Sequence, residues 1–179
     1  MANYAEIKKE FNELLELVSG MVKSLGSGFE EMTQEEIEKG FRAEFMTYSA
    51  AIAMCDGDLD ANEVDMLEDV FDIRATYSDI RQLAEAYLDK ASEGDTVPVM
   101  FKLAVTIDNM VADNPNVPFS LCYKVFSMYK DIAAAMGAAD DALARNELLV
   151  IAQFTLNLRQ FADDNLDARI MRKWEDDDE

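Results

Sequence analysis

The feature that most constrains this 179-residue chain is a spacing of three and four between apolar residues, which recurs along most of its length. Over residues 4–25 the pattern comprises Ile7, Phe11, Leu14, Leu15, Leu17, Val18, Met21, Val22 and Leu25. This spacing gathers apolar side chains on one face of a helix. No segment shows the strict alternation that is typical of strands. We therefore predict an all-α protein with seven to eight helices.

Turn and capping signals divide the chain into these helices. Gly26 and Gly28 end the first helix, and Thr33-Gln34-Glu35-Glu36 is a capping box that opens a second, to about residue 54. Asp60 begins a third, to about residue 71. Four further helices are expected at 78–91, 98–112, 118–138 and 144–161, followed by a short one that carries Leu166, Ile170 and Trp174. We predict one helical domain over 1–165, with the short helix and an acidic tail at 166–179.

One acidic motif occurs twice. Residues 56–63 align with residues 140–147, with the Asp, Leu, Asn and Glu identical, at an offset of 84 residues. The same offset aligns the start of the second helix with Pro118, so whole helix-turn-helix units correspond. Such self-similarity predicts two halves related by a pseudo-twofold axis, with Leu59 and Leu143 buried at equivalent corners.

The carboxylates of this motif allow two interpretations. Capping alone can explain them, because Asp60 can cap the following helix while Glu63 closes a capping box. Alternatively, they bind a divalent cation, since Ca²⁺ and Mg²⁺ prefer oxygen ligands. The better cation site would then comprise Asp56, Asp58, Asp60 and Glu63, and a weaker one Asp140 and Glu147. Neither possible register of the first turn makes a true EF-hand.

The charge of the chain limits its partners. Its 37 acidic and 16 basic residues give a net charge of −21, which repels nucleic acid and anionic membranes and attracts cations and basic proteins. No apolar run reaches the roughly 20 residues of a membrane span, and the N-terminus lacks an apolar signal core. We expect a cytoplasmic protein that does not insert into membranes and that binds a protein with a basic surface. The 11 methionines favour an adaptable apolar contact surface, although most are expected in the core.

The residues required for common catalytic mechanisms are missing. The sequence has no histidine, which removes the usual general base, and it has no glycine-rich phosphate loop. Cys55 and Cys122 lie in helical apolar patterns, which indicates small buried side chains rather than a disulfide. These observations predict a protein that is not an enzyme.

The segment Ala53-Met54-Cys55-Asp56-Gly57-Asp58-Leu59-Asp60-Ala61-Asn62-Glu63 resembles the helix-turn-helix corner of the tellurite-resistance TerB family, which includes the N-terminal domain of a membrane-anchored DnaJ-type co-chaperone. The resemblance covers about residues 34–162. It implies a bacterial, non-enzymatic, all-helical module with two related halves, acidic clusters for divalent metal, and a role in stress response or defence. Asp141 replaces the second-turn glycine of the family, and the N-terminal helix is longer than the family core needs.

Two functions therefore remain open. The first is a TerB-like interaction module that responds to divalent cations. The second is an acidic partner-binding protein, such as an immunity factor or inhibitor, in which the acidic turns are only helix caps.

Overall fold

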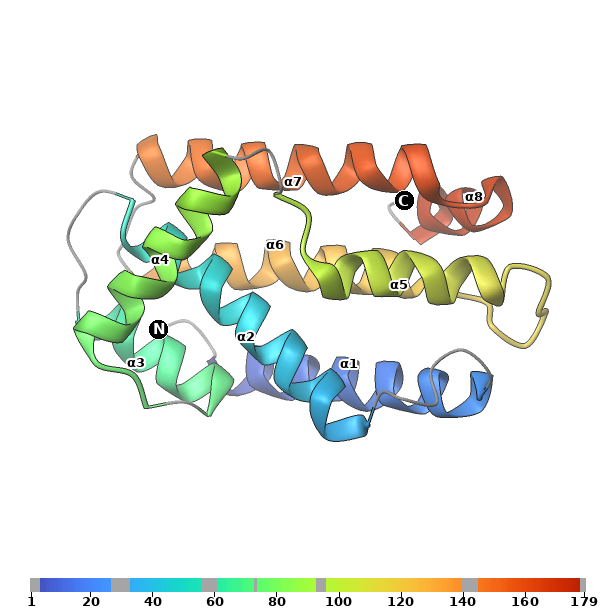
Figure 1. Ribbon diagram of the computed structural model, residues 1–179, viewed down its shortest axis with the longest axis horizontal. Helices are drawn as coiled ribbons and strands as arrows, with labels where there is room; N and C mark the ends of the chain where they lie inside the picture. The colour runs from blue at the N-terminus through green and yellow to red at the C-terminus, as the bar shows by residue number, and fades with distance from the viewer. Residues whose placement is uncertain are drawn as a thin grey trace.

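The computed structural model describes residues 4–26, 33–55, 61–72, 74–92, 96–139 and 145–177. These residues form eight helices and no strand, which confirms the predicted all-α class (Figure 1). The helices are α1 (Tyr4–Leu25), α2 (Gln34–Ala53), α3 (Ala61–Phe71), α4 (Tyr77–Ser92), α5 (Val99–Met110), α6 (Leu121–Ala139), α7 (Arg145–Asn165) and α8 (Ala168–Asp177).

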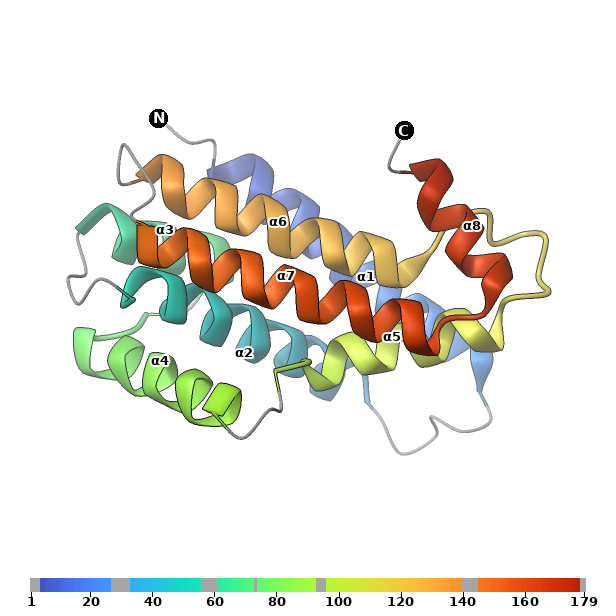
Figure 2. The same cartoon turned by 90° about the horizontal axis from the view of Figure 1, so that it is seen from above.

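Helix α2 lies at the centre of the arrangement. It packs against α1 and against every helix from α3 to α7. Helices α1, α6 and α7 run along the length of the molecule, whereas α3 and α4 lie at one end and α8 at the other (Figures 1 and 2). The last six residues of α2, from Tyr48 to Ala53, are all buried. Small alanines in this stretch let several helices approach the same segment closely.

Aromatic rings connect the central helices. Phe45 of α2 stacks on Tyr129 of α6 with ring centroids 3.9 Å apart, and Tyr48 stacks on Phe154 of α7 at 4.1 Å. Phe11 of α1 meets Phe45 edge to face at 5.1 Å. These contacts join α1, α2, α6 and α7 in one hydrophobic core.

Among the helix starts that the structure describes, those of α2 and α4 have local capping boxes. Thr33 Oγ1 accepts a hydrogen bond from the Glu36 backbone N–H at 3.2 Å, and the Glu36 carboxylate accepts one from the Thr33 N–H at 2.8 Å, as predicted. Thr76 and Asp79 make the same pair of bonds at the start of α4. Helix α4 therefore begins at Tyr77, one residue before the expected Ser78.

The C-terminal helix docks on the body of the protein as its spacing predicts. Leu166, Ile170 and Trp174 are all buried. The Trp174 ring meets Phe126 of α6 at 5.2 Å and lies 4.9 Å from the Arg159 guanidinium of α7. Helix α8 thus closes one end of the space between α6 and α7.

The two copies of the repeated motif lead into equivalent helix starts. Helices α3 and α7 begin at Ala61 and Arg145, which are 84 residues apart, the offset of the repeat. Leu59 and Leu143, the expected corner residues, lie outside the described residues. The twofold relation of the halves stays a prediction. Of the described helices, none is long and apolar enough to cross a membrane.

Candidate functional site

Four of the six predicted cation ligands, Asp56, Asp58, Asp60 and Asp140, lie outside the described residues. The other two occupy matching positions, because Glu63 is the third residue of α3 and Glu147 the third residue of α7. Both are buried, with exposed fractions of 4% and 2%. Within the described ranges, no group of three or more His, Cys, Asp or Glu residues could hold a metal ion.

The positions of Glu63 and Glu147 suit a capping role. In a capping box the glutamate stands at the third position of the helix, where it reaches back to the residue before the first turn. Glu63 and Glu147 stand at this position. A cation site remains compatible with these positions, since the two glutamates could supply one ligand each to a site completed by the preceding turn.

Two other carboxylates among the described residues, one half-buried and one fully buried, cap helices to which they do not belong. The first is Glu44 of α2, which accepts hydrogen bonds from the backbone N–H groups of Val99 and Met100, both at 2.8 Å. These donors are the first two residues of α5. Burial raises the pKa of Glu44, while the two backbone hydrogen bonds and the charge of Lys90 oppose this shift.

The second is Asp108 of α5, which is fully buried and caps α6. It accepts hydrogen bonds from the Ser120 hydroxyl and from the backbone N–H groups of Leu121 and Cys122, each at 2.8 Å. Burial raises its pKa against these three bonds. Because this cap sits at residues 120–122, α6 begins at Leu121 and not at Pro118 as predicted.

A small pocket of about 190 Å³ lies beside the start of α5 and includes Glu44, Tyr48, Tyr87 and Phe154 in its lining. The buried Tyr48 hydroxyl makes no hydrogen bond to any described residue. Burial raises the pKa of Tyr87 to about 12 and that of Tyr48 further. Both phenols therefore stay protonated at neutral pH and are poorly suited to act as a base.

Both cysteines were predicted to be buried, and one of them is. Cys122 is buried and Cys55 is half-buried, and neither forms a disulfide. Burial raises the pKa of Cys122 well above its usual value, and the nearby Asp108 carboxylate adds to the shift. A buried, protonated thiol is a poor nucleophile.

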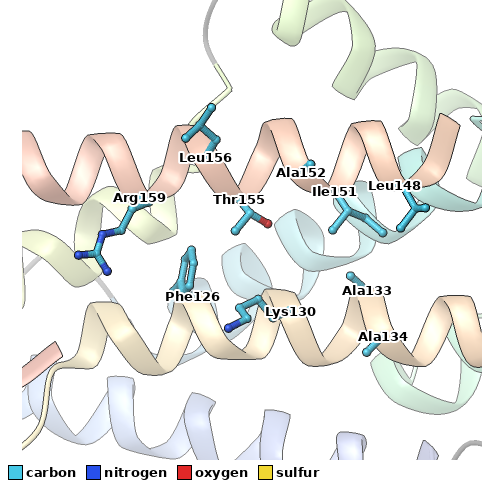
Figure 3. A pocket seen from close by; sticks show the side chains of 10 residues that line it. All are labelled: Phe126, Lys130, Ala133, Ala134, Leu148, Ile151, Ala152, Thr155, Leu156 and Arg159. Carbon is cyan, nitrogen blue, oxygen red and sulfur yellow. The ribbon is translucent and has the colours of Figure 1, made fainter. Parts of the chain in front are cut away.

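An open groove of about 730 Å³ lies between α6 and α7 (Figure 3). It is lined by Phe126, Lys130, Ala133, Ala134, Leu148, Ile151, Ala152, Thr155, Leu156 and Arg159. Alanines of α6 face leucine and isoleucine of α7 at one end, while Lys130 and Arg159 lie toward the other. This groove was not predicted from the sequence.

Helix α7 is apolar on two faces. Its inner face buries Phe154, Leu158 and Ala162. Its outer face leaves Leu148, Leu149 and Leu156 between 50% and 60% exposed. The four-residue spacing of Leu148, Ala152 and Leu156 was the signal available in the sequence. The 11 methionines were a weaker signal of an apolar contact surface, because several of them are core residues, namely Met46, Met66, Met100, Met128 and Met136.

Comparison with models of protein families, with curated proteins and with solved structures finds no match to this chain. The resemblance to the TerB family therefore stays a prediction. The class that the structure itself supports is an all-helical protein with an open apolar groove between α6 and α7.

Proposed function

We propose that this chain is a non-enzymatic, cytoplasmic protein-binding module. The observation that carries the proposal is the apolar outer face of α7, where Leu148, Leu149 and Leu156 are half or more exposed. A helix needs one apolar face to join a core, so a second one is not explained by folding. Contiguous exposed apolar surface on a monomer commonly marks an interaction site.

The charge of the chain indicates the kind of partner. A net charge of −21 attracts a protein with a basic surface at long range and raises the rate of encounter. The apolar groove then supplies the short-range contact, since burial of leucine side chains favours the complex. This combination supports the partner-binding alternative, with a role in stress or defence implied by the TerB resemblance.

Site-specific photocrosslinking in the cells that make the protein tests this function. A photoreactive phenylalanine analogue is placed singly at Leu156, at Leu88 on α4 and at Met110 at the end of α5, three exposed apolar positions on different helices. A discrete adduct with another protein is expected from Leu156, because the apolar outer face of α7 is the proposed contact surface.

The same experiment separates the question of whether the chain binds a protein from the question of which surface binds it. An adduct from Leu88 or Met110 only would support partner binding at a different surface. The absence of a discrete adduct from all three positions would contradict a protein-binding function.

A second candidate function is the cation response that the repeated acidic motif suggests. It is favoured by the equivalent buried positions of Glu63 and Glu147 at helix starts 84 residues apart. The use of Glu44 and Asp108 as helix caps argues for the capping interpretation, because carboxylates of this protein that are withdrawn from solvent, partly or wholly, already serve that role. A divalent-specific increase in thermal stability would favour the cation site.

A further inference from the structure

The groove between α6 and α7 differs in charge from the rest of the chain. Among the described residues that line it, the charged ones are Lys130 and Arg159, both basic. The whole sequence has more than two acidic residues for each basic one. A groove with this lining favours an apolar ligand that carries a negative charge at one end.

The two kinds of lining residue are separated along the groove. Leu148, Ile151 and Ala133 lie at one end, whereas Phe126, Lys130 and Arg159 lie toward the other (Figure 3). Arg159 is held by Asp163 at 3.0 Å and by the Trp174 ring. The Lys130 ammonium lies 5.6 Å from the Phe126 ring centroid, on an exposed side chain that can reach a carboxylate. The two ends of the groove therefore differ: one is apolar and the other carries the basic side chains.

Its length fits a short helix. Leu148 and Arg159 are eleven residues apart on α7, which corresponds to about 16 Å, or roughly three helical turns. A ligand helix of this length presents apolar side chains at positions i and i+4 to the leucine end. One turn further on, position i+8 comes to the cationic end.

We propose that the α6/α7 groove binds an amphipathic helix of another protein, with large apolar anchors over the leucine end and a carboxylate beside Lys130. This inference rests on the proposed protein-binding function and names the partner's chemistry. The partner is basic elsewhere, because the field of a chain with net charge −21 repels a wholly acidic one. The same charge on each copy opposes a second copy of this chain as the occupant.

A displayed library of 14-residue helical peptides tests the proposal against the full chain. Two positions four residues apart carry Leu, Ile, Phe or Met, the position one turn beyond the second is fully random, and the outer face carries lysines. We expect binders enriched in Asp or Glu at the random position. Their affinity is then measured by fluorescence anisotropy.

Two variants with matched controls locate the binding. Leu148→Glu should weaken the selected peptides at least about tenfold, whereas Leu88→Glu, at a similarly exposed leucine of α4, should leave affinity unchanged. Lys130→Gln should weaken the acidic peptides roughly two- to fivefold and should not weaken their Gln counterparts. Lys124→Gln is its control, since Lys124 also lies on α6 over a phenylalanine ring but outside the groove lining. Far-UV circular dichroism confirms that each variant is folded.

Several outcomes would overturn the proposal. These are a failure to select any binder, enrichment of Lys or Arg at the random position, or binding that Leu148→Glu leaves intact. A dimer that Leu148→Glu abolishes in sedimentation would assign the groove to a second copy. If the crosslinking in cells gives an adduct from Leu88 or Met110 alone, the groove is not the binding site, although the protein-binding function still holds.

Discussion

Asp108 belongs to α5, yet it accepts hydrogen bonds from the first two backbone N–H groups of α6 and from the hydroxyl of Ser120, the residue before that helix. Glu44 of α2 likewise accepts hydrogen bonds from the first two backbone N–H groups of α5. The first N–H groups of a helix have no partner within it, and these two carboxylates supply acceptors for them from a neighbouring helix. At the scale of single residues, each carboxylate therefore joins the helix that carries it to the start of the next one.

Asp108→Asn should lower the free energy of unfolding by about 1–3 kcal/mol. The asparagine amide has only one oxygen that can accept. Its NH₂ group would therefore face a donor whose hydrogen bond the second carboxylate oxygen accepts in the original protein. Urea denaturation measures the change. Asp164→Asn, at an exposed position of α7, is the control and should stay within about 0.5 kcal/mol of the original. An equally small effect at Asp108 would show that the cap contributes little.

The cation interpretation also belongs to single residues. A divalent ion that binds only the folded state at about 100 times its dissociation constant stabilises that state by roughly 2.7 kcal/mol. The melting temperature should then rise by roughly 5–11 °C. Asp56→Asn with Glu63→Gln should remove most of the divalent-specific shift, and the matching pair at Asp140 and Glu147 should remove less.

Monovalent salt at equal ionic strength is the control, because screening also stabilises an acidic chain. If Ca²⁺, Mg²⁺ and Mn²⁺ give no shift beyond this control, the acidic turns are helix caps.

At the scale of elements, local signals in the sequence predicted most helices and their approximate ends. Helix α1 ends as expected at Leu25, followed by Gly26 with a positive φ of 62°. Ser120 marks the start of α6, because its hydroxyl accepts a hydrogen bond from the Tyr123 backbone N–H at 3.1 Å, and the expected start at Pro118 overlooked this local capping signal. The contribution of Asp108 could not be predicted in this way, because Asp108 is twelve residues away from Ser120 in the chain. A cap of this kind depends on the packing of two helices.

The groove escaped prediction for a related reason. Helical spacing shows that Leu148 and Leu156 share a face of α7, but not whether another helix covers it. That depends on the position of α6 and α8. The acidic turns, in contrast, were visible in the sequence, and the structure describes only Glu63 and Glu147 among their predicted ligands.

The docking of α8 gives a prediction at this scale. Ile170→Ala should cost about 2–5 kcal/mol, since Ile170 is fully buried and its removal leaves a cavity. Trp174 is the single tryptophan of the chain, so its fluorescence reports the same helix. Acrylamide should quench it weakly in the original protein and more strongly in the variant. Strong quenching in the original protein would contradict the docked helix.

At the scale of the whole molecule, the charge of −21 acts against compactness, because like charges repel more strongly in the folded state. The melting temperature should therefore rise between low and moderate monovalent salt, as screening weakens this repulsion. Differential scanning calorimetry measures it. A flat response would mean that the charges are already compensated in the folded protein.

Mild acidification should also raise the melting temperature. The pKa values of Glu44 and Asp108 are raised above 4.5 and 3.8 by burial, so the folded state holds these protons more tightly than the unfolded chain. Stability therefore increases as the pH falls from 7 through the raised values. Below the ordinary values the capping carboxylates Glu36 and Asp79, whose pKa values are lowered by hydrogen bonds to Thr33 and Thr76, lose their contribution.

Melting temperature as a function of pH should then have its maximum at mildly acidic pH. Moderate salt should reduce the part of this rise in melting temperature that comes from general repulsion, and leave the part that comes from Glu44 and Asp108. A maximum at or above neutral pH would contradict this assignment.

The central claim is that the α6/α7 groove binds a partner, and methyl NMR tests it most directly. The leucine methyl groups of the chain are labelled, and the crosslinked partner or a selected peptide is added. The signals of Leu148 and Leu156 should shift while that of Leu88 stays in place, since the first two line the groove and the third lies on α4. Shifts confined to Leu88, or no shift on saturation, would contradict the claim.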